Sequence, residues 1–385
     1  MAYTDIDDPS IYFQTVLWTG DGAADTRTIS FDGNSNMQPD WVWHKQRDDT
    51  YGNHVFDSSR GFGANKELVT RGSFVEGDTS NFNTGANGYV NAAASNGFVV
   101  KKGTGGTGNV YINQSGDSHV AWNWKANGGT TATNDASSTG VGTIDSVIQA
   151  NTTAGFSIVT YTGTTSAGSI AHGLGAVPKM IIVKNRQDGA ENWAVQSPTA
   201  SDPWTDYMYL DLPNALDDNA GLWNDTAPTS TVFTIGTSGV VSQAENHVAY
   251  CFAEKQGYSK IGSYVGNSNA DGTFVYTGFK PAWIMIKHTG SFGGDQQYAT
   301  WGIWDNKRAT SNVVTQATML TANNAYVEGN RGNNSSSTLV ALDMLSNGFK
   351  IRNTSYEVNQ SGTYIYMAFA ERPFVTSKGT PTTAR

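Results

Sequence analysis

Hydrophobic and polar residues alternate along this chain in short runs, and no run of ten or more residues keeps a helical period. A clear example is the segment 39–45, Pro-Asp-Trp-Val-Trp-His-Lys, where two tryptophans and the lysine share one face and Val42 and His44 share the other. Successive side chains of a β-strand point to opposite faces. A proline at the first position of a strand loses no ladder hydrogen bond. The pattern therefore predicts short strands and an all-β fold.

The same pattern occurs three times. The proline box at 39–45 recurs at 178–184 as Pro-Lys-Met-Ile-Ile-Val-Lys and at 281–287 as Pro-Ala-Trp-Ile-Met-Ile-Lys. A second box closes each unit, and its copies are His119-Val-Ala-Trp-Asn-Trp-Lys-Ala126, His247-Val-Ala-Tyr-Cys-Phe-Ala-Glu254 and Tyr364-Ile-Tyr-Met-Ala-Phe-Ala-Glu371. Such self-similarity predicts an internally triplicated protein.

The closing boxes have two apolar faces of unequal bulk. Trp122 and Trp124 fall on one face of the first box, and Ala121 falls on the other. This asymmetry predicts a central strand that is buried on both sides, with a second layer packed closely over the small face. We therefore predict antiparallel β-sandwiches of a jelly-roll or lectin-like kind.

The boxes divide the 385 residues into three tandem domains. Residues 127–145 are rich in Gly, Thr and Ser, and we predict that they form a flexible linker. The second and third units follow each other without a linker, so we expect a rigid pair and a separable first unit. Residues 375–385 form a polar tail. The predicted sandwich domains are 1–126, 146–255 and 256–374.

Composition narrows the possible partners. The net charge of −9 would repel a phosphate backbone, so no nucleic-acid binding is expected. No stretch approaches the roughly 18 apolar residues of a membrane span, and the first residues do not resemble a signal peptide, so we expect synthesis in the cytoplasm without membrane insertion. The single cysteine, Cys251, lies in an apolar run and is interpreted as a small buried hydrophobe. With 43 glycines and 15% charged residues, the chain suits turn-rich β-structure outside a cell.

Two aspartates are candidate catalytic carboxylates. Asp57 and Asp305 each follow a strand-like run and precede an arginine by three residues. One interpretation is glycoside hydrolysis, which needs two carboxylates on either side of one bond. The other is a turn-capping aspartate that pairs with its arginine, and it is favoured because the middle unit has Ser197 near that place. We therefore predict no catalytic residue and a protein that is not an enzyme.

The histidines and acidic clusters do not form a recognisable metal or cofactor site. His172 lies in a glycine-rich turn and has no accompanying nucleophile motif. Asp5–Asp8 and Asp217–Asp218 do not resemble an EF-hand loop. The remaining histidines lack metal-ligand spacing, so we predict no metal and no cofactor. They are His44, His54, His119, His247 and His288.

The aromatic residues are the most suggestive functional material, because aromatic faces are common at binding surfaces. Most of them lie in the repeated boxes and are assigned to the core, whereas Trp204 and Trp223 lie in Pro- and Asp-rich loops and are predicted to be exposed. Loops held at the ends of rigid sandwiches are where contacts with a partner surface are expected. The candidates for this contact, which would be host contact if the protein is an adhesin, are Trp204, Trp223, Asp217, Asp218, Phe292, Tyr326 and Arg331.

The boxes as a set resemble a family of repeated β-domains in the structural proteins of tailed phages, especially marine and cyanobacterial phages. Further motifs that carry the resemblance are Val-Phe-Asp-Ser-Ser-Arg-Gly at 55–61 and Gly-Tyr-Ser-Lys-Ile-Gly-Ser-Tyr-Val-Gly-Asn at 257–267. The match runs from about Pro9 to Phe374. The resemblance implies a tail-fibre-like virion protein and supplies no catalytic residues.

The leading hypothesis is a non-enzymatic protein on the surface of the phage particle, a tail fibre or tail-associated adhesin that contacts the host. Its expected partners are other virion proteins, two further copies in a homotrimer, and a host polysaccharide or receptor. The first unit, with its acidic leader, is the expected virion anchor. The first alternative is a purely architectural piece, such as a tail adaptor, nozzle, head decoration or capsid fibre. The second is a carbohydrate depolymerase.

Overall fold

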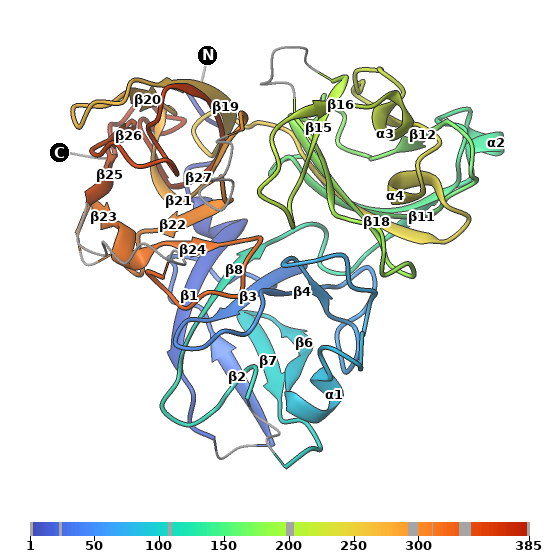
Figure 1. Ribbon diagram of the computed structural model, residues 1–385, viewed down its shortest axis with the longest axis horizontal. Helices are drawn as coiled ribbons and strands as arrows, with labels where there is room; N and C mark the ends of the chain where they lie inside the picture. Colours follow the sequence, from blue (N-terminus) through green and yellow to red (C-terminus); the bar gives the residue numbers. More distant parts are fainter. Residues whose placement is uncertain are drawn as a thin grey trace.

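The computed structural model describes residues 3–22, 25–106, 110–197, 204–291, 299–309, 311–330 and 340–382. The fold is all-β, with 41% strand and 6% helix arranged in several antiparallel sheets. The predicted all-β class with antiparallel sheets is therefore confirmed. Three lobes, one for each repeat, meet at the middle of the molecule (Figure 1).

The first repeat forms a larger and a smaller sheet. Its elements are η1 (Pro9–Ile11), β1 (Phe13–Thr19), β2 (Thr26–Ser30), β3 (Trp41–Gln46), β4 (His54–Asp57), β5 (Leu68–Val69), α1 (Thr84–Asn87), β6 (Tyr89–Ala94), β7 (Gly97–Lys101) and β8 (Ser118–Trp124). The larger sheet has the order β1-β8-β3-β4-β5, and the smaller sheet has the order β2-β7-β6.

The second repeat has the longest sheet. Its elements are β9 (Ala132–Asn134), α2 (Ala136–Thr139), β10 (Ser146–Asn151), β11 (Phe156–Thr162), β12 (Gly168–Ala171), β13 (Met180–Asn185), β14 (Ala194–Gln196), β15 (Asp206–Tyr209), β16 (Asp217–Asp218), α3 (Ala220–Trp223), β17 (Val232–Ile235), α4 (Gly239–Ser242) and β18 (Asn246–Phe252). The sheets are β16-β15-β14-β13-β18-β11-β10-β9 and β12-β17.

The third repeat again pairs a larger sheet with a smaller one. Its elements are β19 (Ser259–Gly266), β20 (Phe274–Tyr276), β21 (Phe279–His288), β22 (Gly302–Asp305), β23 (Val313–Thr315), η3 (Gln316–Thr318), β24 (Leu320–Thr321), β25 (Val340–Leu345), β26 (Gly348–Ile351) and β27 (Gly362–Pro373). The sheets are β19-β27-β21-β22-β24 and β20-β26-β25-β23.

The three larger sheets share one strand order. In each repeat the closing strand lies between the opening strand and the proline-box strand. The proline-box strand pairs in turn with the next strand along the chain. The three sets of four strands are β1-β8-β3-β4, β11-β18-β13-β14 and β19-β27-β21-β22. The repetition that the boxes predict is therefore present in the topology.

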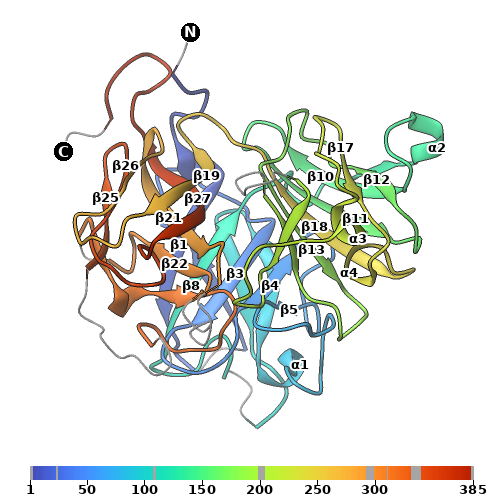
Figure 2. The same cartoon turned by 45° about the horizontal axis from the view of Figure 1, so that its top comes forward.

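The two faces of each closing strand pack against different cores. The bulky faces of β8, β18 and β27 lie in one cluster with buried residues from all three repeats, which we call the central core. Within it the ring centroids of Trp41 and Tyr250 are 4.5 Å apart, and those of Trp124 and Trp283 are 5.5 Å apart. The alanine faces lie instead in three clusters, one confined to each repeat. Figure 2 shows the three larger sheets converging on the region between the lobes.

Residues 127–145 are not a flexible linker, and the first unit shares the central core with the other two in addition to having its own cluster. The carboxylate of Asp40 accepts hydrogen bonds of 2.8 Å from the backbone N–H groups of Gly128 and Gly129. Further along, Ala132 to Asn134 pair with β10, and Asp135 caps α2. The low-complexity segment is ordered because the carboxylate and the sheet edge satisfy its backbone donors.

The two ends of the described chain meet at the third lobe (Figure 1). The backbone N–H and the hydroxyl of Ser377 each donate to the carboxylate of Asp7 at 2.6 Å. Asp8 accepts from the backbone N–H of Ser10 and caps η1. The polar tail and the acidic leader therefore stabilise each other.

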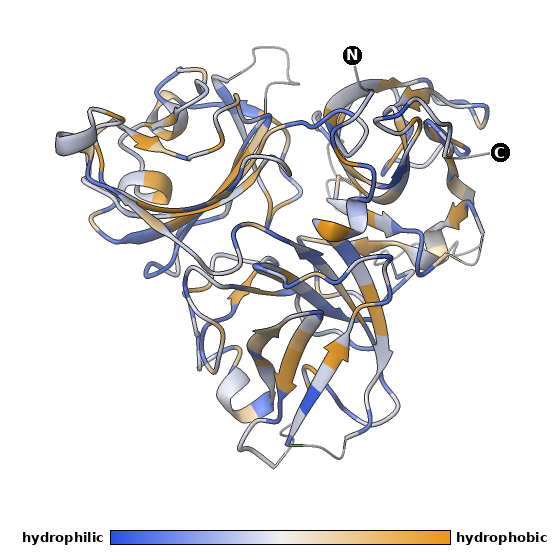
Figure 3. Ribbon diagram, turned by 180° about the vertical axis from the view of Figure 1, so that it is seen from behind, coloured by the Kyte–Doolittle hydropathy of each residue, from blue (hydrophilic) through white to orange (hydrophobic). Residues whose placement is uncertain are grey.

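Hydrophobic residues concentrate on the strands, while the connecting loops are mainly hydrophilic (Figure 3). Cys251 is fully buried, as predicted, and burial raises the pKa of its thiol to about 12. In the described ranges no helix is both long enough and apolar enough to cross a membrane.

Candidate functional site

The junction between the first and second repeats contains a buried carboxylate. Asp57 ends β4 and accepts from the backbone N–H of Arg60 at 2.8 Å and from its guanidinium Nε at 2.5 Å. The hydroxyl of Tyr250, from the second repeat, donates to the same carboxylate at 2.7 Å. Both charged side chains have no exposed surface. Burial would lower the pKa of Arg60, but the neighbouring Asp57 outweighs burial and raises it, so the guanidinium stays charged.

The junction between the third and first repeats contains the same arrangement. Asp305 ends β22 and accepts from the backbone N–H of Arg308 at 2.9 Å and from its Nε at 2.6 Å. The indole Nε1 of Trp122, from the first repeat, donates to this carboxylate at 2.9 Å. Trp122 and Tyr250 hold equivalent positions in the closing boxes. The predicted pairing of both aspartates with their arginines is confirmed, and the second partner comes from the next repeat.

A second layer of charge surrounds each of these pairs. Glu76 lies 3.5 Å from Arg60 and also pairs with Arg186 of the second repeat. Glu328 lies 2.9 Å from Arg308 and 2.5 Å from Arg47 of the first repeat. The backbone of each glutamate also bonds across the junction. The N–H of Glu76 donates to the carbonyl of Arg186, and the N–H of Glu328 donates to the carbonyl of Arg47, both at 2.8 Å.

The junction between the second and third repeats has the same backbone hydrogen bond as the other two but lacks the buried carboxylate at the position of Asp57. Leu216 N–H donates to the carbonyl of Thr289 at 2.8 Å, as Glu76 and Glu328 do to arginines at the other junctions. In sequence, the places of Asp57 and Tyr250 are held by Ser197 and Met367. Carboxylate and aromatic donor are thus both replaced at one junction and both retained at the other two.

One further contact recurs at all three junctions. The residue just before β4, β14 or β22 is buried, and its side chain donates to a backbone carbonyl of the preceding repeat in the ring. These bonds are Asn53 Nδ2 to Thr321 at 2.9 Å, Trp193 Nε1 to Val69 at 3.1 Å and Trp301 Nε1 to Tyr209 at 2.8 Å. Each repeat therefore contacts the next head to tail, and the third contacts the first. Head-to-tail contacts that return to the start form a closed ring.

Two of the three proline-box lysines also donate hydrogen bonds across a junction. Lys184 donates to the carbonyl of Ser73 at 3.1 Å, and Lys287 donates to the carbonyl of Asn214 at 3.0 Å, in each case across a junction. Lys45 donates to the carbonyl of Asp49 at 2.9 Å within its own repeat. Burial lowers the pKa of Lys45 and Lys287 to about 7 and that of Lys184 to about 8. All three are fully buried, so these amines serve as hydrogen-bond donors to the backbone.

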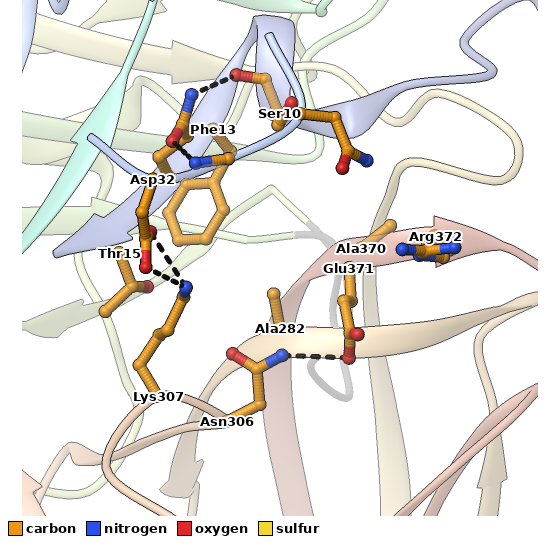
Figure 4. A pocket seen from close by; sticks show the side chains of 13 residues that line it. Ser10, Phe13, Thr15, Asp32, Ala282, Asn306, Lys307, Ala370, Glu371 and Arg372 are labelled. Carbon is orange, nitrogen blue, oxygen red and sulfur yellow. Dashed lines mark hydrogen bonds and ion pairs between the residues drawn. The ribbon is translucent and has the colours of Figure 1, made fainter. Parts of the chain in front are cut away.

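A pocket of about 290 Å³ opens at the junction of the third and first repeats, and we call it the third-junction pocket (Figure 4). Its apolar part is formed by Phe13 and by alanines of β21 and β27. On one side Lys307 donates to both carboxylate oxygens of Asp32 at 2.8 Å. On the other side Asn306 donates to Glu371 at 2.8 Å.

The structure brings three of the predicted host-contact residues to one sheet edge and does not bring the others to it. Asp217 and Asp218 are exposed on β16, and Trp204 is partly buried two residues before β15, the strand that pairs with β16. Tyr326 is partly buried in the third repeat. The exposure predicted for Trp223 is wrong, because this last residue of α3 is fully buried among the apolar side chains of the second repeat. Phe292 and Arg331 lie outside the described residues.

The histidines lie inside the protein. His172 is buried; its Nδ1 accepts from the backbone N–H of Leu174 at 3.2 Å, and burial lowers its pKa to about 4. His44 Nε2 lies 3.1 Å from His119 Nδ1. Within the described ranges, no three His, Cys, Asp or Glu side chains gather as metal ligands would.

Sequence reasoning missed the third-junction pocket, because one part of its wall comes from residues 10–34 and the other from residues 282–372. One signal was present in the sequence. The turn Asp305-Asn-Lys-Arg308 carries two residues with long polar side chains where the equivalent turn Asp57-Ser-Ser-Arg60 carries serines.

Comparison with known proteins places the chain in a family. Residues 8–373 match a family described as a domain of unknown function, DUF7483. The chain belongs to this family. No curated protein and no solved structure matches it.

Proposed function

We propose that this chain is a non-enzymatic structural protein on the surface of a tailed-phage particle, a tail fibre or tail-associated adhesin that contacts the host. The observation that carries the proposal is the closed ring of three repeats around one central core. Such a body holds its outer loops in fixed positions, and fixed loops suit repeated weak contacts with a surface. The resemblance of the boxes to phage structural proteins supports the same assignment.

The proposal includes three sandwich domains of a jelly-roll or lectin-like kind in tandem. Support comes from the smaller sheet that packs over the alanine face of each closing strand. We also propose that the chain assembles into homotrimers, with the first repeat as the anchor. Light scattering on the purified chain tests the trimer, since a mass of one chain in solution would contradict it.

The buried state of Asp57 and Asp305 supports the non-enzymatic part of the proposal. Each carboxylate is fully enclosed and already accepts hydrogen bonds from an arginine and from an aromatic donor. A glycosidase needs carboxylates that reach a substrate. Incubation of the chain with host polysaccharide should leave the length of the polysaccharide chains unchanged, and shortened chains would overturn this part of the proposal.

Labelling and adsorption together test the adhesin proposal. An antibody against the chain should label the tail region of intact particles in electron micrographs, and the purified chain should compete with particles for the host surface. The variant Asp217→Ala/Asp218→Ala alters an exposed edge, and Asp271→Ala on an exposed loop is its control. Intact particles that adsorb poorly with the first variant alone would support host contact by β16. Normal adsorption combined with failure of the chain to compete would favour the purely architectural role.

A further inference from the structure

We propose that the third-junction pocket binds a neutral sugar unit. The proposal rests on the adhesin function proposed above, for which it names a ligand class and a site. At the junction of the first and second repeats, hydrogen-bonded side chains of the protein occupy the place that corresponds to this pocket.

The corresponding place at the junction of the first and second repeats is filled by the protein itself. There Asp40 accepts 2.8 Å hydrogen bonds from the backbone N–H groups of Ala126, Gly128 and Gly129. The hydroxyl of Ser58 donates to the same carboxylate at 2.7 Å. The amide of Gln149 reaches in from the second repeat and contacts both serines of the turn. The polar groups of this cluster are therefore bonded to one another.

At the third junction the same positions hold different residues. Ala282 stands where the first repeat has Asp40, so the carboxylate that would gather backbone donors is missing. Asn306 and Lys307 stand where the first repeat has the two serines, and their longer side chains reach to the sides of the pocket. The result is a cavity of about 290 Å³, roughly the volume of ten water molecules in the liquid. That is sufficient for one sugar ring and its hydroxyls.

The chemistry of the walls fits a polyhydroxylated ligand. The carboxylates of Asp32 and Glu371 are acceptors, the ammonium of Lys307 is a donor, and the amide of Asn306 is both (Figure 4). Vicinal hydroxyls of a sugar each donate and accept, so they can bridge such neighbouring groups. Phe13 and two alanines, all almost fully buried, form a small apolar floor that the C–H face of the ring can touch.

The charge of the pocket favours a neutral ligand. Two carboxylates, of Asp32 and Glu371, face two cationic side chains, of Lys307 and Arg372. Lys307 is already paired with Asp32, and Lys280 lies 2.9 Å from Glu371. An anionic ligand would meet the carboxylates of Asp32 and Glu371, and a cationic ligand would meet Lys307 and Arg372, whereas hydroxyl groups can bond to groups of either sign.

The test is ligand-observed saturation-transfer NMR on the full chain, with glucose, galactose, mannose and N-acetylglucosamine as separate probes. At least one of these sugars should show transfer. Asp32→Ala and Asn306→Ala should each weaken its binding by roughly tenfold or more, because each removes direct hydrogen bonds. The matched control is Asp271→Ala, since Asp271 and Asp32 are exposed by 79% and 68% and each lies 2.8 Å from a lysine. Its binding should equal that of the parent, and circular dichroism should show all variants folded.

Three outcomes would overturn the site: no transfer to any neutral sugar, transfer that both pocket variants leave unchanged, or binding of glucuronic acid in preference to the neutral sugars. The adsorption experiment keeps this failure separate from failure of the adhesin role. A chain that competes for the host surface but binds none of these sugars retains the adhesin function and loses this site. A chain that binds a sugar in the pocket but does not compete retains the site and loses the adhesin function.

Discussion

The hydrogen bond from Tyr250 to Asp57 offers a direct perturbation of one junction. Tyr250→Phe removes only the hydroxyl that donates at 2.7 Å to a fully buried carboxylate. A hydrogen bond to a charged group contributes about 1.5 to 3 kcal/mol, so we expect the free energy of unfolding to fall by about that amount. Removing Asp57 itself would cost roughly 3 to 5 kcal/mol, because Arg60 would be left without its partner. The loss in Tyr250→Phe should stay below that value, because this variant keeps the pair of Asp57 and Arg60.

Tyr161→Phe is the matched control. Its hydroxyl is also buried and donates at 2.8 Å, but to the neutral backbone carbonyl of Val241 within the same repeat. The expected loss is about 0.5 to 1.5 kcal/mol. Urea unfolding monitored by tryptophan fluorescence gives both values, and the slope of free energy against urea should be unchanged. If Tyr250→Phe costs no more than Tyr161→Phe, the junction contact does not stabilise the ring.

Three further substitutions test particular positions. Burial lowers the pKa of His54 and His119 to about 3, so below pH 6.5 the unfolded state binds more protons than the folded state. The free energy of unfolding should therefore fall as the pH falls from 6.5 towards 3. His54→Leu should weaken this pH dependence, which urea titrations across that range measure. Gly97 has a φ of +125°, and a Cβ there would collide with the backbone of β2, so Gly97→Ala should lower the melting temperature more than Gly116→Ala, where φ is +88° and the space is open. Trp223→Ala should cost about 3 to 5 kcal/mol in urea unfolding, whereas alanine at the exposed positions of β16 should change stability by less than about 0.5 kcal/mol.

Alternation and repetition predict most of the sheet structure. A period of two places the proline-box and closing segments on strands, and the unequal faces of the closing strand are present as predicted. The pairing of Asp57 with Arg60 follows from a spacing of three residues and a turn. These features are local, or they recur in every repeat, so one sequence carries enough information to predict them.

The partner of each bulky face could not be predicted in the same way. An aromatic row such as Trp122 and Trp124 could pack in the core of its own sandwich or in a core shared with other repeats. The sequence pattern shows that such residues are buried but does not show which residues they contact. Trp223 shows the limit of composition, since a loop rich in Asp and Pro can still fold one tryptophan inward. The third-junction pocket depends on Asp32 and Lys307 meeting across the ring, and no local pattern contains that contact.

The central claim is that the three repeats form one closed body. Differential scanning calorimetry of the intact chain tests it most directly. A shared core and three linked junctions predict a single reversible transition whose calorimetric enthalpy equals its van 't Hoff enthalpy. Two or three separate transitions, with a first repeat that unfolds independently of the other two, would contradict the claim.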